Sequence, residues 1–213
     1  MGKIIAVAGK GGVGKTTLCG LLIKHLCKTG KSPVLAVDAD ANSNLNEVLG
    51  VEIGQTMGEI REEIERAGTD AVSSLPAGVT KADYLQMRLM GAITEDDDFD
   101  LMVMGRTEGQ GCYCFVNGLV QTQIQRLESR YPYIVVDNEA GMEHISRGIL
   151  PAMDIAVLVS DCSRRGIQAV SYTHLDVYKR QVIDFIKRIP PYSLCFCFPF
   201  HFTTYGNFIN SYR

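Results

Sequence analysis

A glycine-rich run near the start of the chain limits its fold more than any other feature. Residues 9–16 fit the pattern G-x-x-x-x-G-K-[ST], directly after the apolar run Lys3–Ala8 and directly before leucines at helical spacing. In that strand–loop–helix context, glycines let backbone N–H groups turn inward around phosphate oxygens, and the helix N-terminus adds its positive end. The sequence therefore predicts a phosphate-binding loop at a strand–helix junction.

The polar side chains of this loop indicate a nucleotide bound with magnesium. Lys15 is placed to neutralise β- and γ-phosphate charge, and the Thr16 hydroxyl to ligate Mg²⁺. The alternative is a glycine turn that contains a lysine by chance. Aspartates at the ends of two later strands argue against it. The expected nucleotide-binding residues are Gly11, Gly12, Val13, Gly14, Lys15, Thr16 and Thr17.

Strand and helix signals alternate over the first 170 residues. Nearly all-apolar strands separated by helices are typical of a mostly parallel sheet with helices on both faces. We therefore expect an α/β P-loop NTPase domain over residues 1–170. The strand candidates are Lys3–Ala8, Pro33–Val37, Leu101–Met104, Tyr133–Val136 and Ile155–Val159; the helix candidates are the run of Leu18, Leu21, Leu22 and Leu26, a surface helix over Thr56–Ala67, and Val116–Arg130.

Acidic residues follow two of these strands. Asp38 and Asp40 follow the second strand, and Asp137 ends the fourth. Ligands of such folds bind beyond the carboxyl ends of the strands, so these carboxylates should meet the phosphate loop. There they can hold Mg²⁺ through water and orient an attacking water. Taken singly, each could instead be a strand-end cap or a turn former.

The composition changes abruptly at Ser171. Residues 171–213 hold 11 of the 17 aromatic residues but one glycine and no alanine, and the run Cys195–Phe202 fits neither helix periodicity nor a buried strand. The segment SYTHLDVYKRQ over residues 171–181 resembles a spurious junction that recurs in protein sequences read from assembled data. We expect residues 171–213 to be an atypical tail, truncated or frame-shifted; the alternative is an unusual aromatic C-terminal element.

Charge and hydropathy exclude several classes of function. The formal net charge is −3, which gives no basic field for nucleic acid. No segment reaches about 18 uninterrupted apolar residues, and the N-terminal apolar run is too short for a signal peptide. We expect a cytoplasmic protein with no nucleic-acid partner and no membrane span. Seven cysteines without an export signal favour metal-binding or buried thiols over disulfides.

Two of those cysteines form a Cys-x-Cys pair between the third strand and a helix. Cys112 and Cys114 would share one face if the backbone were locally extended. Two thiolates are half of a tetrahedral site, so a second subunit related by a twofold axis would complete a set of four. The alternative is a pair of small buried hydrophobic side chains.

The loop carries a second lysine, Lys10, and so resembles the deviant Walker A motif of the MinD/ParA/nitrogenase-iron-protein ATPases. The Cys-x-Cys loop and the run Asp137-Asn-Glu-Ala-Gly-Met-Glu-His144 narrow the resemblance. They are similar to those of the CooC-type ATPases, which help to insert nickel into carbon monoxide dehydrogenase. The resemblance covers roughly residues 1–170.

The resemblance implies an ATP-hydrolysing homodimer whose nucleotide state is coupled to nickel insertion. Lys10 would reach the phosphates of the partner subunit, and Lys15 those of its own. Asp40 would position the hydrolytic water, Asp38 would lie near Mg²⁺ through water, and Asp137 would begin the Walker B and switch II segment.

The same resemblance implies metal ligands and a client. Cys112 and Cys114 would bind Ni²⁺ or Zn²⁺ at the dimer interface, with His144 a weaker candidate. The client would be carbon monoxide dehydrogenase or acetyl-CoA synthase. One departure stands out: the strand whose end carries an adenine-contacting asparagine in that family is not recognisable after Ser171.

Two other classes stay open. A positioning ATPase of the MinD/ParA kind would act on membrane or DNA. It would need a basic amphipathic helix or a basic surface, and neither is recognisable in the sequence. An iron–sulfur ATP-gated reductase would bridge the dimer with a cluster held by four thiolates. Its family uses two widely separated cysteines, unlike the Cys-x-Cys spacing.

Overall fold

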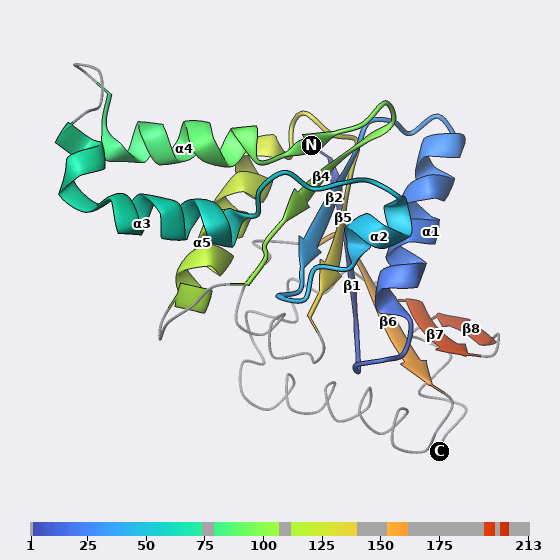
Figure 1. Cartoon of the computed structure of the whole chain (residues 1–213). Helices are drawn as coiled ribbons and strands as arrows, with labels where there is room; N and C mark the ends of the chain where they lie inside the picture. Colours follow the sequence, from blue (N-terminus) through green and yellow to red (C-terminus); the bar gives the residue numbers. More distant parts are fainter. Residues whose placement is uncertain are drawn as a thin grey trace, which may run out of the picture.

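One sheet of eight strands forms the centre of the structure, a computed structural model that describes residues 2–73, 79–106, 112–139, 153–161, 194–198 and 201–204. The strands are β1 Lys3–Gly9, β2 Val34–Ala39, β3 Thr94–Glu95, β4 Phe99–Val103, β5 Tyr133–Asn138, β6 Ile155–Asp161, β7 Leu194–Phe198 and β8 His201–Thr204. Their order is β3-β4-β2-β5-β1-β6-β7-β8 (Figure 1). Only the β3–β4 and β7–β8 pairs among them are antiparallel.

Helices cover both faces of this sheet. The described helices are α1 Lys15–Lys28, α2 Leu45–Leu49, α3 Met57–Ser73, α4 Lys81–Gly91 and α5 Cys112–Leu127. In Figure 1, α1 and α2 lie on one side of the strands, and α3, α4 and α5 on the other. The expected fold class, a mostly parallel α/β sheet covered on both faces, is confirmed.

The core is divided into two layers by the alternation of side chains along the strands. In β1, Ile4 and Ala6 pack into the layer under α3, α4 and α5, whereas Ile5 and Val7 pack into the layer under α1 and α2. Because both faces are buried, most strand positions are apolar, and the buried polar ones lie near the carboxyl ends of β2, β5 and β6. That is why these strands read as continuous apolar runs in the sequence.

The leucine run forms a helix as predicted, with Leu26 buried and Leu18 and Leu22 partly buried against the core. Cys19, Ile23 and Leu26 face the sheet, whereas the side chain of Leu21 is 62% exposed. Leu21 also fits a helical period, so periodicity alone does not show which residues turn inward. On the same helix, a Cβ atom at Gly20 would collide with Val48, which shows how closely α2 packs against α1.

The helix predicted over Thr56–Ala67 exists as α3, but it is longer and more buried than a surface helix. Thr56 and Glu59 form a reciprocal cap at its start: the Thr56 N–H donates to Glu59 Oε2 at 2.8 Å, and the Glu59 N–H donates to Thr56 Oγ1 at 3.2 Å. Met57 and Ile60 are buried in the core. The interleaved charged residues of this segment made its buried apolar face difficult to recognise from the sequence.

Two helices and the two-residue strand β3 were not predicted. The start of α4 carries a capping box, in which Thr80 Oγ1 accepts the Asp83 N–H at 3.1 Å and Asp83 Oδ2 accepts the Thr80 N–H at 3.2 Å. The spacing of that threonine and aspartate is a start signal visible in the sequence. The short helix α2 has no comparable side-chain cap.

The aromatic tail contains two strands that were not predicted, and the burial of their side chains lies outside what the structure describes. Strand β7 pairs in parallel with β6, from Val157 opposite Leu194 to Asp161 opposite Phe198, and β8 pairs antiparallel with β7. Aromatic residues favour extended backbone even without a two-residue alternation. The segment over residues 171–181 lies outside the described residues.

No helix in the part of the chain that the structure describes is both long enough and apolar enough to cross a membrane.

Candidate nucleotide site

The carboxyl ends of three neighbouring strands bring the predicted acidic residues together. In the parallel register, Asp137 of β5 lies opposite Val7 of β1 on one side and opposite Asp38 of β2 on the other. The glycine loop leaves β1 two residues after Val7. The two aspartates therefore lie beside the base of the loop, as the sequence predicts.

The glycine loop has the backbone that a phosphate cradle requires. Gly12 and Gly14 have φ angles of 77° and 90°, which disfavour any residue with a side chain, and no atom lies within 4 Å of a Cβ built on either. Gly14 also caps α1, and no side chain bonds to the free N–H groups at this helix start. Open space beside these glycines and uncapped N–H groups at the helix start fit a phosphate chain.

Lys15 is held at the mouth of this loop. Its side chain lies in the first turn of α1, the residue is 7% exposed, and Nζ donates to the Lys10 carbonyl oxygen at 3.3 Å. Lys10 itself is exposed. The two lysines that the sequence singles out thus differ in environment, one turned inward and one facing solvent.

Asp38 is a buried carboxylate held by backbone donors. Its Oδ1 accepts the Asp40 N–H and its Oδ2 accepts the Leu45 N–H, each at 3.0 Å. Burial raises its pKa to about 6, with the nearby Asp137 also raising it and the two backbone hydrogen bonds acting against the rise. A carboxyl with such a pKa is ready to exchange its proton for a cation near neutral pH.

Asp137 is buried too, and one of its oxygens has no partner. Burial raises the pKa of this carboxyl, whereas the Thr16 hydroxyl and the Lys15 ammonium lower it. Its Oδ1 is fully buried and accepts no hydrogen bond in the structure. A buried anionic oxygen left over beside Thr16 fits the ligand sphere of Mg²⁺, directly or through water.

Asn138 is a site residue that sequence reasoning missed. Its side chain is buried, and Nδ2 donates to the Val7 carbonyl oxygen at 3.0 Å. This bond ties the end of β5 to the end of β1, and so fixes Asp137 against the base of the loop. The sequence shows only that this asparagine directly follows the strand-end aspartate Asp137, and its partner lies 131 residues away.

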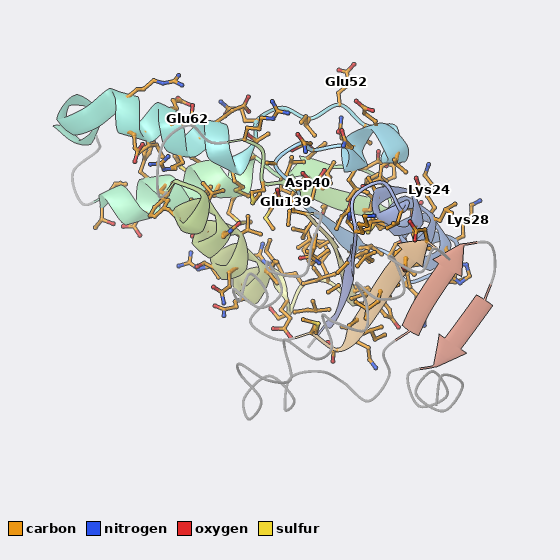
Figure 2. All side chains as sticks on the ribbon, turned by 90° about the horizontal axis from the view of Figure 1, so that it is seen from below. Lys24, Lys28, Asp40, Glu52, Glu62 and Glu139 are labelled. Atoms are coloured by element: carbon orange, nitrogen blue, oxygen red, sulfur yellow. The ribbon has the colours of Figure 1, made fainter. Side chains whose placement is uncertain are left out.

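Asp40 begins the loop after β2. Its Oδ1 accepts the Asn42 N–H at 2.8 Å, and its carbonyl oxygen accepts the Ser43 N–H at 3.1 Å. Because Ala39 lies opposite Asn138 in the sheet, Asp40 and Glu139 leave adjacent strands side by side (Figure 2). Asp40 thus lies at the same edge as Asp38 and Asp137, but in a more exposed position.

The backbone around the cysteine pair differs from the expected one. Cys112 and Cys114 lie in the first turn of α5, not in an extended segment. Positions two apart on a helix lie on different faces, so the argument that both share a face is wrong. Their side chains, and all of His144, lie outside what the structure describes. Among the described residues, no group of three or more His, Cys, Asp or Glu side chains could hold a metal ion.

The pKa of Asp38 leads to a stability prediction for the metal-free protein. A raised pKa means that the folded state binds the proton more tightly than the unfolded chain, so ionisation costs stability as pH rises from about 4 to about 6. The cost is at most about 3 kcal/mol. Asp38→Asn removes this titration. In EDTA, the melting temperature of Asp38→Asn minus that of wild type should therefore increase as the pH is raised from about 4 to about 6.

A matched control for this measurement is Asp83→Asn. Hydrogen bonds from Thr80 hold the pKa of the exposed Asp83 carboxyl below its ordinary value, so it stays ionised above pH 4.5. Its difference from wild type should be constant between pH 4.5 and 7.5. A constant difference for Asp38→Asn as well would contradict the burial argument.

Comparison with known proteins places this site in a family. The model of the AAA_31 family, an AAA domain, matches residues 2–185. An uncharacterized ATP-binding protein of Methanocaldococcus jannaschii is 48% identical over 164 residues, covering 77% of this chain and 64% of that protein. The carbon monoxide dehydrogenase accessory protein CooC of Rhodospirillum rubrum is 31% identical over 175 residues, covering 78% and 66%. The chain thus spans slightly less than two thirds of either relative.

The fold has a counterpart among solved structures. A ParA family ATPase from Chlorobium tepidum superposes with a TM-score of 0.63 at 17% sequence identity, over 92% of this chain and 74% of that one. At this identity the likeness concerns the fold alone.

Proposed function

The chain belongs to the AAA_31 family of AAA domains, and from that premise we propose that it is an ATPase that dimerises on Mg²⁺-ATP and serves nickel insertion into a client enzyme. The observation that carries the ATPase part is the unpartnered buried oxygen of Asp137, placed between Asp38 and the Thr16–Lys15 corner of the glycine loop. A cation bridging phosphate and carboxylate would satisfy it.

Each residue at this edge has a chemical task in the proposal. The N–H groups of the loop and the Lys15 ammonium bind and orient the phosphates, and the Thr16 hydroxyl with the Asp38 and Asp137 carboxylates would hold Mg²⁺. The bound ion would neutralise charge that develops on the phosphates. The Asp40 carboxylate, at the open side of the edge, orients the attacking water.

The nickel part of the proposal rests on separate observations. The chain carries a Cys-x-Cys pair in the first turn of α5, and a relative at 31% identity is named an accessory protein of carbon monoxide dehydrogenase. The positive end of a helix stabilises negative charge, which suits thiolate ligands. We propose that Cys112 and Cys114 of two subunits bind one Ni²⁺ or Zn²⁺ as cargo, and that carbon monoxide dehydrogenase or acetyl-CoA synthase receives nickel.

The dimer is tested through Lys10. Lys10 is exposed beside the phosphate loop, and its side chain is free to reach a partner subunit's nucleotide. Lys10→Ala should keep nucleotide affinity within about twofold, because Lys15 remains, but lose the dimer formed with a non-hydrolysable ATP analogue. Hydrolysis should fall at least about tenfold, since charge supplied in trans is worth that much or more. Light scattering and phosphate release measure the two effects.

Lys3→Ala is the control for that experiment. Lys3 is also exposed, but it begins β1, at the end of the strand opposite to the glycine loop. The control should dimerise and hydrolyse ATP as wild type does. A Lys10→Ala protein that still dimerises and turns over normally would refute the shared site.

A further inference from the structure

A chain of hydrogen bonds leads from the buried carboxylates to an arginine that no motif includes. Asp40 donates its N–H to Asp38, and Asn42 donates its N–H to Asp40 Oδ1 at 2.8 Å. The Asn42 side-chain oxygen in turn accepts a hydrogen bond from Arg106 Nη2 at 2.7 Å. Arg106 comes from the loop after β4, 64 residues further along the chain.

The place of Arg106 is fixed by the strand end that precedes it. The Met104 N–H donates to the Asp38 carbonyl oxygen at 2.9 Å, and the Met104 carbonyl oxygen accepts the Gly58 N–H at 2.9 Å. Gly105 has a φ of 72°, and a Cβ atom there would collide with Thr56. The backbone is therefore anchored to β2 and to the start of α3 directly before Arg106.

Asn42, on the other side of this hydrogen bond, lies in an exposed loop. Asn42 is exposed, and the loop after β2 reaches Ser43, whose φ of 48° is left-handed. The carboxylate of Asp40 takes its described hydrogen bond from the Asn42 N–H, so any displacement of Asn42 moves the donor that orients it. Arg106 is exposed too, but its backbone follows the anchored Met104 and Gly105. Its hydrogen bond to Asn42 would therefore limit that displacement, and the planar guanidinium has a preorganised geometry for it.

From this geometry we propose that Arg106 is a positioning residue for Asp40, acting through Asn42. The inference rests on the proposed ATP hydrolysis, in which Asp40 orients the water. Arg106 touches neither the phosphate loop nor the buried carboxylates in the described contacts. It should therefore affect the turnover step and leave nucleotide binding alone.

The test compares turnover with binding in the full chain. Arg106→Ala should lower kcat for ATP about fivefold or more, as expected for the loss of one charge-assisted hydrogen bond, and leave the Kd of a non-hydrolysable ATP analogue within about twofold. Asn42→Ala should have the same effect, and the double variant should be no worse than either single variant. Arg106→Lys should restore part of kcat, because an ammonium can also donate to Asn42.

Arg66→Ala is the matched control. Arg66 is an exposed arginine on α3 that pairs with Glu62 one turn away, and its loss should leave kcat unchanged. Melting temperatures establish that all variants fold. A wild-type kcat in Arg106→Ala, or additive losses in the double variant, would overturn this inference alone. No turnover in the wild-type protein would overturn the proposed function, and this inference with it.

Discussion

Lys15→Ala should lower the affinity for Mg²⁺-ATP by at least about 100-fold and reduce ATP hydrolysis to background. Lys15 is the inward-turned lysine of the glycine loop. Because the residue is only 7% exposed, water cannot easily solvate its ammonium in place of a phosphate group. In the structure Nζ already reaches back over the loop to the Lys10 carbonyl oxygen. Two buried carboxylates stand beside the same pocket, so phosphate without this cation would face net negative charge.

A second lysine on the same helix provides the control. Lys24 of α1 is exposed and donates to the Val48 carbonyl oxygen at 3.1 Å, away from Asp40 at the sheet edge (Figure 2). Lys24→Ala should bind and hydrolyse ATP as wild type does. Nucleotide titration by calorimetry and a phosphate-release assay measure both variants. Retained nanomolar-to-micromolar binding in Lys15→Ala would remove the basis for a P-loop ATPase.

The strands were predictable because of where they lie. Those in the middle of the sheet are covered on both faces, so β1, β2, β4, β5 and β6 are mostly apolar, and their predicted bounds lie within two residues of the observed ones. The parallel topology then placed Asp38 and Asp137 at one edge without any knowledge of side-chain contacts. Short local runs of residues were therefore enough to predict both the fold and the position of the acidic residues at the carboxyl ends of the strands.

Features that depend on packing were not predictable in the same way. Periodicity did not show that Leu21 of α1 is exposed whereas Ile23 is buried. A Cys-x-Cys spacing does not specify its backbone, and α5 begins earlier than the apolar pattern indicated. Asn138 and Arg106 carry no motif, since their partners lie 131 and 64 residues away.

Replacing Cys112 and Cys114 together by alanine should remove nickel binding and leave nucleotide binding intact. With two subunits contributing four thiolates, wild type should bind about half an equivalent of Ni²⁺ or Zn²⁺ per chain in the presence of a non-hydrolysable ATP analogue. The double variant should bind close to none, and its Kd for the analogue should stay within about twofold of wild type. Anaerobic equilibrium dialysis with elemental analysis measures the metal.

The chain supplies its own control in a second pair of the same spacing. Cys195 and Cys197 lie in β7, where positions two apart share one face of the strand, so by backbone geometry alone they are the better-arranged pair. The proposal nevertheless assigns the metal to the pair at the start of α5, where the helix end favours thiolate charge. Cys195→Ala with Cys197→Ala should therefore keep full nickel binding. If that variant loses the metal while Cys112→Ala with Cys114→Ala retains it, the nickel assignment is wrong and the metal is bound by the cysteines of β7.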